Sequence, residues 1–204
     1  MGVTIFFKGT LKNTNLIDSF IDEMTDIAQT MKWEYQILDD DWSQPATATL
    51  SFDEGRGEIT SDLGLKGISI SLHPGCESLP LYFNADGALR TPMSVIMIND
   101  GTMKPETASN FVKTQFAPPA VHISIVKLLK YINKVYVPDL TVMDESDYWE
   151  TEDRDTLIQR TGFLNKKLDQ IGDTLNSIDN QEIKNCSPEQ LAEILERRLK
   201  QFLK

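Results

Sequence analysis

The chain has 204 residues, of which 40% are hydrophobic and 25% charged, and these ordinary globular values exclude wholesale disorder. Its formal net charge of −11 disfavours nucleic acids and anionic membranes as partners, because both are bound mainly through Lys and Arg. No apolar run approaches the roughly 18 residues that cross a bilayer. We therefore expect an acidic cytoplasmic protein.

The N-terminal part has the pattern of a strand, a helix and a second strand. Residues 3–8 alternate between apolar and mostly polar side chains, which is typical of a strand with one buried face. Residues 16–31 carry apolar side chains at three- and four-residue spacing, which predicts an amphipathic helix. Trp33, Tyr35 and Ile37 return to period two and predict the second strand.

An antiparallel meander is expected next. Two hairpins are predicted, one from residues 48–52 and 58–61, and one from residues 68–72 and 79–83. The apolar run 94–98 is short, which favours a further strand. Residues 99–117 are interpreted as a loop with one helical turn.

The C-terminal half is predicted to be largely helical. Pro118-Pro119 opens a helix that is apolar on one side as far as Ile132, and residues 135–142 suggest a last strand, which Pro138 restricts to an edge or a bulge. Beyond residue 157, leucines and isoleucines keep a three-four spacing, and Ser187-Pro188 resembles the start of a final helix.

This order of elements predicts an α+β fold of the type β-α-β4/5-α. A curved antiparallel sheet would carry helices on one face, the plan that TATA-binding-protein-like half-domains and helix-grip domains share. We expect a sheet domain over residues 1–143. Residues 144–204 would form an acidic junction and a C-terminal helical hairpin, packed on the same domain or in an oligomer contact.

The most reactive-looking cluster is the turn that contains His73 and Cys76. A thiolate near an imidazole could act as a nucleophile, and His-x-x-Cys could supply half of a zinc site. The other histidine and cysteine, His122 and Cys186, offer no paired spacing, so neither a metal nor another cofactor is predicted. A plain Pro-Gly turn is the favoured interpretation, and His122 is interpreted as a satisfied helix histidine.

The junction combines acids with two adjacent aromatics. Eight acids and one base lie between residues 139 and 155, but no glycine is present, so the run fails the EF-hand pattern. Glu152, Asp153 and Asp155 fit the first turn of the next helix, and the remaining acids fit a solvated edge. Tyr148 and Trp149 are interpreted either as core anchors or as residues that recognise a partner.

Three functions follow from these patterns. The preferred one is a non-catalytic protein-interaction or scaffold module, whose Tyr148-Trp149 junction contacts a partner or a second copy. The alternative is a small-molecule binder with an apolar cavity between the sheet and the helix over residues 119–133. An enzyme that uses Cys76 or converged carboxylates is the third. No nucleotide-binding loop or nucleophile elbow is present, which favours the non-catalytic functions.

Overall fold

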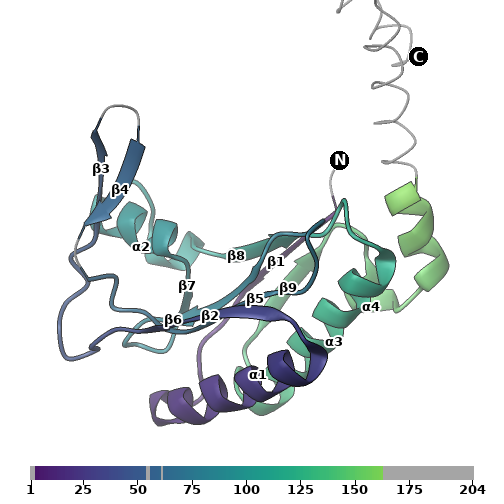
Figure 1. Cartoon of the computed structure of the whole chain (residues 1–204), viewed down its shortest axis with the longest axis horizontal. Helices are drawn as coiled ribbons and strands as arrows, with labels where there is room; N and C mark the ends of the chain where they lie inside the picture. Colours follow the sequence, from purple (N-terminus) through teal and green to yellow (C-terminus); the bar gives the residue numbers. More distant parts are fainter. Residues whose placement is uncertain (1–2, 54–55, 61, 163–204) are drawn as a thin grey trace, which may run out of the picture.

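The computed structural model describes residues 3–53, 56–60 and 62–162 (Figure 1). The elements are β1 (Thr4–Lys8), η1 (Thr14–Leu16), α1 (Ile17–Met31), β2 (Glu34–Asp39), β3 (Thr49–Asp53), β4 (Arg56–Thr60), β5 (Lys66–Ser71), β6 (Leu79–Phe83), β7 (Leu89–Arg90), α2 (Pro92–Asn99), η2 (Pro105–Thr107), β8 (Asn110–Lys113), α3 (Pro119–Val135), β9 (Thr141–Asp144) and α4 (Tyr148–Thr151). Residues 154–162 are helical as well. The helical patterns predicted beyond residue 162 lie outside the described residues.

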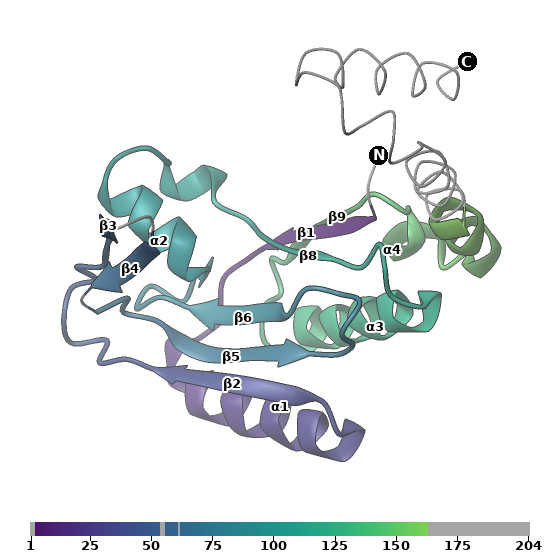
Figure 2. The same cartoon turned by 45° about the horizontal axis from the view of Figure 1, so that its top comes forward.

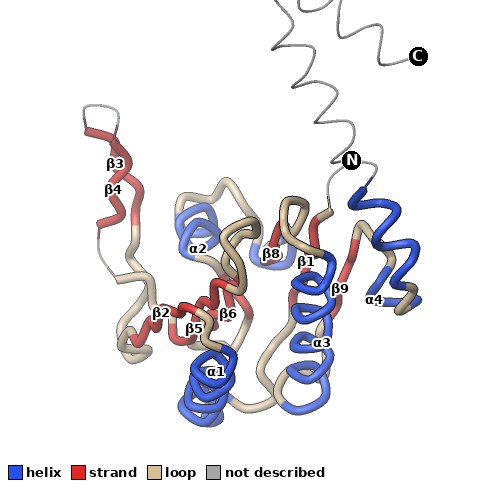
Figure 3. Tube along the Cα trace, turned by 45° about the vertical axis from the view of Figure 1, so that its right-hand side comes forward, coloured by secondary structure: helices blue, strands red, loops and turns tan. Residues whose placement is uncertain are grey.

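Antiparallel sheets and helices make up the molecule, as expected for an α+β fold. One sheet has the strand order β8-β1-β9, and the other has the order β2-β5-β6-β7. Helices α1 and α3 lie on the same side of the two sheets (Figures 1 and 2). The hairpin β3-β4 forms a separate two-stranded sheet that projects beyond α2 (Figure 3). The coarse fold class is therefore confirmed.

The two sheets meet between β6 and β8. These strands are not paired by backbone hydrogen bonds, and the buried side chain of Asn110 connects them instead. Pro80 of β6 has no N–H to donate across this seam. The Asn110 side-chain amide donates to the carbonyl oxygen of Pro80 at 3.0 Å and to that of Arg90 at 3.4 Å. Because Asn110 is buried, its amide would lose its hydration without compensation if these acceptors were missing. The two sheets are thereby held side by side.

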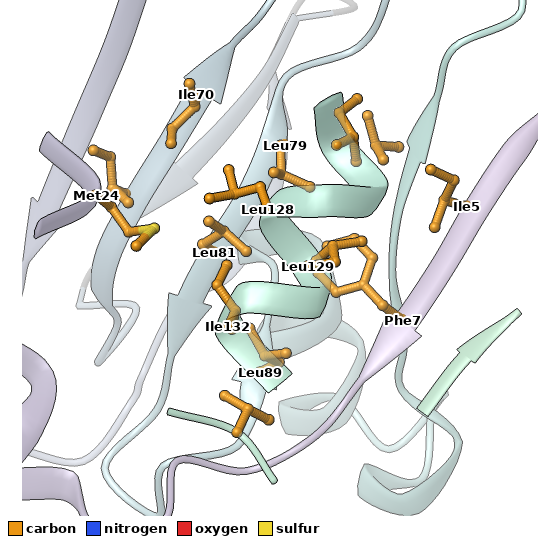
Figure 4. Packing of buried hydrophobic residues seen from close by; sticks show 14 of the residues in the cluster. Ile5, Phe7, Met24, Ile70, Leu79, Leu81, Leu89, Leu128, Leu129 and Ile132 are labelled. Atoms are coloured by element: carbon orange, nitrogen blue, oxygen red, sulfur yellow. The ribbon is translucent and has the colours of Figure 1, made fainter. Parts of the chain in front are cut away.

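A single large core lies between the sheets and helices α1 and α3. Figure 4 shows Ile5, Phe7, Ile70, Leu79, Leu81 and Leu89 from the strands meeting Met24 of α1 and Leu128, Leu129 and Ile132 of α3. Fully burying such a side chain stabilises a fold by about 1.5–3 kcal/mol. Tyr148 and Leu157 belong to the same core, so the described residues after β9 pack on the sheet layer.

The predicted first helix is confirmed as α1. Its buried side chains are Ile17, Phe20, Met24 and Ala28, at three- and four-residue spacing. On the side toward α3, the Glu23 carboxylate accepts hydrogen bonds from the hydroxyls of Tyr131 and Tyr136. The two helices are thus joined by polar contacts in addition to the core.

The strand predicted over residues 94–98 is wrong, because this run forms helix α2. Thr91 and Ser94 make a reciprocal capping box, in which each side-chain oxygen accepts a hydrogen bond from the other residue's N–H, and Pro92 occupies the first turn. Val95 packs with Leu65 and Tyr82 in a second, smaller apolar cluster. The cap and this packing together favour a helix over an extended run.

Two boundaries in the second half also differ from expectation. The segment 99–117, interpreted as a loop with one helical turn, contains such a turn, η2, but also the four-residue strand β8, which was not expected. The last strand begins later than predicted, because α3 continues to Val135 and β9 starts only at Thr141. Pro138 therefore precedes the strand, and β9 is an edge strand, as a nearby proline favours.

Candidate functional site

The face of the β8-β1-β9 sheet that points away from α3 carries an exposed apolar row. Alternate residues of a strand point to opposite faces, so Ile5 and Phe7 enter the core and Phe6 points outward. Phe6 is paired in register with Phe111 on one side and with Met143 on the other. Phe111 is 48% exposed and Met143 61% exposed. We call Phe111, Phe6 and Met143 the apolar row.

Lysines border the apolar row along the strands. Lys113 lies two residues beyond Phe111, and Lys8 lies two residues beyond Phe6, so both belong to the outward face. The rings of Phe6 and Phe111 are tilted, with centroids 6.0 Å apart. The row therefore combines two aromatic rings and a methionine with positive charges nearby, although the whole chain is acidic.

Two adjoining depressions open on this side of the molecule. The first, of about 180 Å³, is lined mainly by Phe6, Met143 and hydroxyl-bearing residues of the loop before β8 and of β9. The second, of about 270 Å³, is lined by Lys8, Gly9, Thr10, Ala88, Arg90, Pro105, Glu106, Ala108, Asp139 and Thr141. We call them the apolar groove and the polar cleft. Lys8 and Thr141 line both, so the two depressions are neighbours.

A buried polar network lies on the opposite side of the same sheet, around His122 of α3. The imidazole is 2% exposed. Its Nδ1 lies 2.8 Å from the hydroxyl of Thr114, and its Nε2 lies 3.0 Å from Asp144 Oδ2 and 3.0 Å from Ser146 Oγ. Because the single hydroxyl proton of Ser146 is donated to Asp144 Oδ1, hydrogen-bond accounting assigns a proton to Nε2 of His122. The prediction of a satisfied helix histidine is confirmed.

Asp144 organises the turn that follows β9. Its carboxylate accepts hydrogen bonds from the Ser146 N–H and hydroxyl, from the Trp149 N–H and from His122. Burial by itself raises the pKa of Asp144, but the contacts with His122 and Ser146 outweigh burial and lower it. The expectation of a solvated edge is thus wrong for Asp144, which is 4% exposed.

Thr114, His122 and Asp144 are arranged like a hydroxyl, a base and an orienting carboxylate. In an acyl-transfer enzyme, the hydroxyl must also reach a substrate carbonyl and its oxyanion donors. Thr114 is 2% exposed, and its hydroxyl also lies 3.3 Å from the Val3 carbonyl oxygen. The hydroxyl is therefore enclosed by the protein, and the arrangement connects β1, α3 and β9 as a structural network.

His73 and Cys76 lie in a turn beside β8. The imidazole Nδ1 of His73 accepts a hydrogen bond from the Gly75 N–H at 2.9 Å, and the Cys76 thiol donates to the Glu77 carbonyl oxygen at 3.0 Å. Burial raises the pKa of the Cys76 thiol, which reduces its thiolate fraction at neutral pH. The two side chains thus make separate contacts within the turn, and a role in binding or catalysis stays a prediction.

Tyr148 and Trp149 lie at the start of α4. Tyr148 is 8% exposed and its ring meets the edge of the His122 imidazole, with centroids 6.1 Å apart. Trp149 is partly buried against the core, and the Lys130 ammonium lies 5.5 Å from its ring centroid. Both side chains pack on the core from the junction. Recognition of a partner by either residue stays a prediction.

The acids after α4 divide as expected only in part. Asp153 accepts hydrogen bonds from the N–H groups of Asp155 and Thr156 and so caps the helical stretch 154–162, and Asp155 lies in its first turn. Glu152 instead ends α4 and forms an ion pair with Lys130. This acid therefore joins α4 to α3.

The apolar row was missed by pattern reasoning, although one signal pointed to it. Phe6 occupies the outward set of an alternating strand, where a polar residue is expected. The positions of Phe111 and Met143 depend on pairings with a strand more than 100 residues earlier. No local pattern reveals such pairings.

Comparison with protein-family models gives no match, and neither curated proteins nor solved structures match the chain. Within the described ranges, no three His, Cys, Asp or Glu side chains are grouped to hold a metal ion. Nor does any helix there have the length and apolar character needed to cross a membrane.

Proposed function

We propose that this chain is a non-catalytic cytoplasmic interaction module that binds a short segment of a partner protein on the apolar row. Phe111 and Met143 are exposed on either side of the partly buried Phe6, and this continuous row carries the proposal. Contiguous apolar side chains on the outer face of a sheet mark a candidate site for binding another protein segment. We also propose that the sheet is curved as in TATA-binding-protein-like or helix-grip domains. Such a curved face would accommodate a bound peptide segment.

The size of the face favours a segment over a second folded domain. Three strands about 4.8 Å apart, each contributing about four residues at 3.3 Å, cover on the order of 200 Å². A stable interface between two folded proteins buries about 800 Å² per partner. A second copy of this chain would therefore gain too little area from the apolar row, whereas a helix or an extended peptide would cover it.

The charges select the composition of the segment. Along the strand direction, Lys113 lies on one side of Phe6 and Lys8 lies on the other. Among the described residues, no carboxylate lies within 4.0 Å of either ammonium group. Acidic groups that flank an aromatic or aliphatic side chain would meet these two cations. The proposed partner is thus an apolar peptide segment with Asp or Glu on both sides.

A peptide-display selection on the full chain tests the proposal. Random 15-residue peptides are the probe, and selected peptides should be rich in aromatic or aliphatic residues flanked by acids. The double substitution Phe111→Ser and Met143→Ser should weaken their binding at least about tenfold, since the apolar contacts of both side chains are lost. Met31→Ser is the matched control, because Met31 is 51% exposed but lies on α1.

Three results count against the proposal. The first is that selection returns no peptide, and the second is that the peptides bind the double variant as well as the parent. The third is a dimer, detected by light scattering, that the double substitution dissociates. The last result would assign the row to a second copy. Lys113→Glu adds a test of charge, because selection on this variant should lose its preference for acids at one end of the peptide.

The apolar small-molecule alternative has less support. The expected site lies between the sheets and α3, where Ile125, Leu129 and Ile132 are fully buried in the core. An enzyme that uses Cys76 is disfavoured by the raised pKa of its thiol. Both alternatives rank below the interaction module.

A further inference from the structure

The polar cleft lies where β1 leaves its sheet. Its floor is the end of β1, where the carbonyl oxygen of Gly9 accepts a hydrogen bond from the Leu89 N–H at 3.0 Å. One wall comes from Asp139 and Thr141 at the entry to β9. Arg90 and the loop around η2 form the other wall. Gly9 itself is closely packed, because an added Cβ would approach Val137 Cγ1 to 2.5 Å. Four segments that are distant in sequence thus line the cleft.

Charges of both signs line this cleft without pairing with one another. Lys8 and Arg90 provide the cations, and Glu106 and Asp139 provide the carboxylates. Within the described residues, none of the four forms an ion pair within 4.0 Å. The Lys8 ammonium donates to the backbone carbonyl of Glu106, not to its carboxylate. Two cations and two carboxylates thus line the same cleft without forming ion pairs with one another.

Arg90 is the group with the most unused hydrogen-bonding capacity. Its side chain is half-buried, and it donates from Nη1 to the carbonyl oxygen of Leu89 at 2.9 Å. A guanidinium carries five N–H donors in a planar fork that matches a carboxylate. Burial lowers the pKa of Arg90, which reflects the cost of keeping the charge partly away from water. A carboxylate in the cleft would compensate that cost.

Asp139 has a free acceptor for the opposite charge. Its Oδ1 accepts a hydrogen bond from the Thr10 N–H at 2.8 Å, which fixes the side chain beside the cleft. Among the described residues no donor reaches its Oδ2, which leaves this oxygen for an ammonium group, and the Glu106 carboxylate lines the same cleft. A ligand that carries both an anion and a cation would therefore find a partner for each of its charges in the cleft.

We propose that the polar cleft binds a free α-amino acid with an apolar side chain. The α-carboxylate lies on Arg90, and the α-ammonium group lies between Asp139 and Glu106. The side chain extends past Lys8 and Thr141 into the apolar groove, toward Phe6 and Met143. The cleft of about 270 Å³ and the groove of about 180 Å³ provide room for one such molecule. This site shares Phe6 and Met143 with the apolar row, whereas Arg90, Asp139 and Glu106 belong to the polar cleft alone.

Isothermal titration of the full chain with matched small molecules tests the proposal. L-leucine is the principal probe, and 4-methylpentanoate and isoamylamine are the analogues that lack the ammonium and the carboxylate, respectively. Each analogue should bind at least about tenfold more weakly than leucine, because a charge-assisted hydrogen bond is lost. Glycine should also bind more weakly than leucine, since it has no side chain for the groove.

Substitutions in the cleft assign the contacts. Arg90→Gln should weaken leucine binding at least about tenfold. Asp139→Asn keeps an oxygen for the Thr10 N–H but removes the negative charge, and it should weaken leucine without weakening 4-methylpentanoate. Lys12→Gln is the matched control, because Lys12 is exposed and outside the cleft. Thermal melts confirm that each variant is folded.

The outcomes separate this proposal from the proposed function. Absence of saturable leucine binding, equal binding to Arg90→Gln, or equal binding of leucine and 4-methylpentanoate would each overturn the amino-acid site. Phe111→Ser should abolish much of the peptide binding and leave leucine binding unchanged, because Phe111 does not line the cleft or the groove. Met143→Ser should weaken leucine but not glycine.

Discussion

At the scale of single residues, Asp144 accounts for more of the structure than its place in an acidic run suggests. One buried carboxylate satisfies donors from α3, from its own turn and from the first residues of α4. A charged group is retained in the interior only when its partners replace the lost water. The position of Tyr148 in the core therefore depends on Asp144.

Replacing Asp144 by Asn should strongly destabilise the protein. The uncharged amide would present an N–H₂ group to donors that now meet oxygen, and each buried donor left without an acceptor costs about 1–3 kcal/mol. Urea unfolding followed by fluorescence measures the loss. Asp155→Asn is the control and should stay within about 0.5 kcal/mol, because Asp155 is exposed. Equal effects of the two substitutions would contradict the structural role of Asp144.

The pH dependence of stability has a definite sign. The pKa of Asp144 is lower in the folded chain than its usual value of about 3.9, so acidification protonates the unfolded chain first. Its contribution should be complete above about pH 5 and should disappear as pH falls through 3.9 toward the folded pKa. Urea unfolding from pH 7 to pH 3 should show the parent and Asp144→Asn converging. A constant difference would speak against this assignment.

At the scale of elements, β5 depends on a glycine. Gly67 has φ +142, and a Cβ built there would lie 2.2 Å from the Leu81 carbonyl oxygen in the paired strand β6. Close approach of two backbones thus excludes any side chain at this position. The hydrogen-bonded ladder between β5 and β6 carries Ile68 and Leu81 into the core.

Gly67→Ala should destabilise the fold more than a glycine substitution in a loop. The backbone conformation alone costs a side-chain-bearing residue about 1–3 kcal/mol, and the clash with β6 adds to this cost. Gly101→Ala is the matched control: Gly101 also has a positive φ, +79, but an added Cβ would meet nothing within 4 Å. Thermal unfolding compares the variants. A Gly67→Ala melting temperature equal to that of Gly101→Ala would refute the close approach.

The periodicity of apolar residues predicted those helices and strands that show it within their own sequence. The three-four spacing of residues 16–31 gave α1, and the alternation of residues 3–8 gave β1. Helix α2 was missed because its apolar run is too short to separate strand from helix, although the capping pair Thr91 and Ser94 was readable. Strand β8 was missed because its partner β1 lies about 100 residues away. The candidate site is hard to predict for the same reason.

At the scale of the whole molecule, one core joins the two sheets. Phe7 of the first sheet and Leu81 of the second belong to the same buried cluster, as do Met24, Leu129 and Leu157. Neither sheet has a separate large core among the described residues. The sheet layer and the helices that cover it should therefore respond to stress as one unit.

Urea unfolding should show one cooperative transition for this unit. Far-UV circular dichroism follows the helices and strands, and tryptophan fluorescence follows Trp33, Trp42 and Trp149, which all pack against the core. The two probes should give coincident midpoints, as two-state unfolding requires. Ile5→Val and Leu81→Ala should each shift both midpoints together. Separate transitions would mean that the two sheets are independent units.

The place of β1 in its sheet has a consequence for biosynthesis. Strand β1 leaves the ribosome before both of its partners, residues 110–113 and 141–144, although it is the central strand of β8-β1-β9. Ile5, Phe6 and Phe7 therefore stay unpaired with either partner strand until most of the described chain has been translated. Such long-range pairing slows folding and exposes an apolar segment to aggregation. Translation rate and chaperone access to the nascent chain should thus govern the yield of this protein.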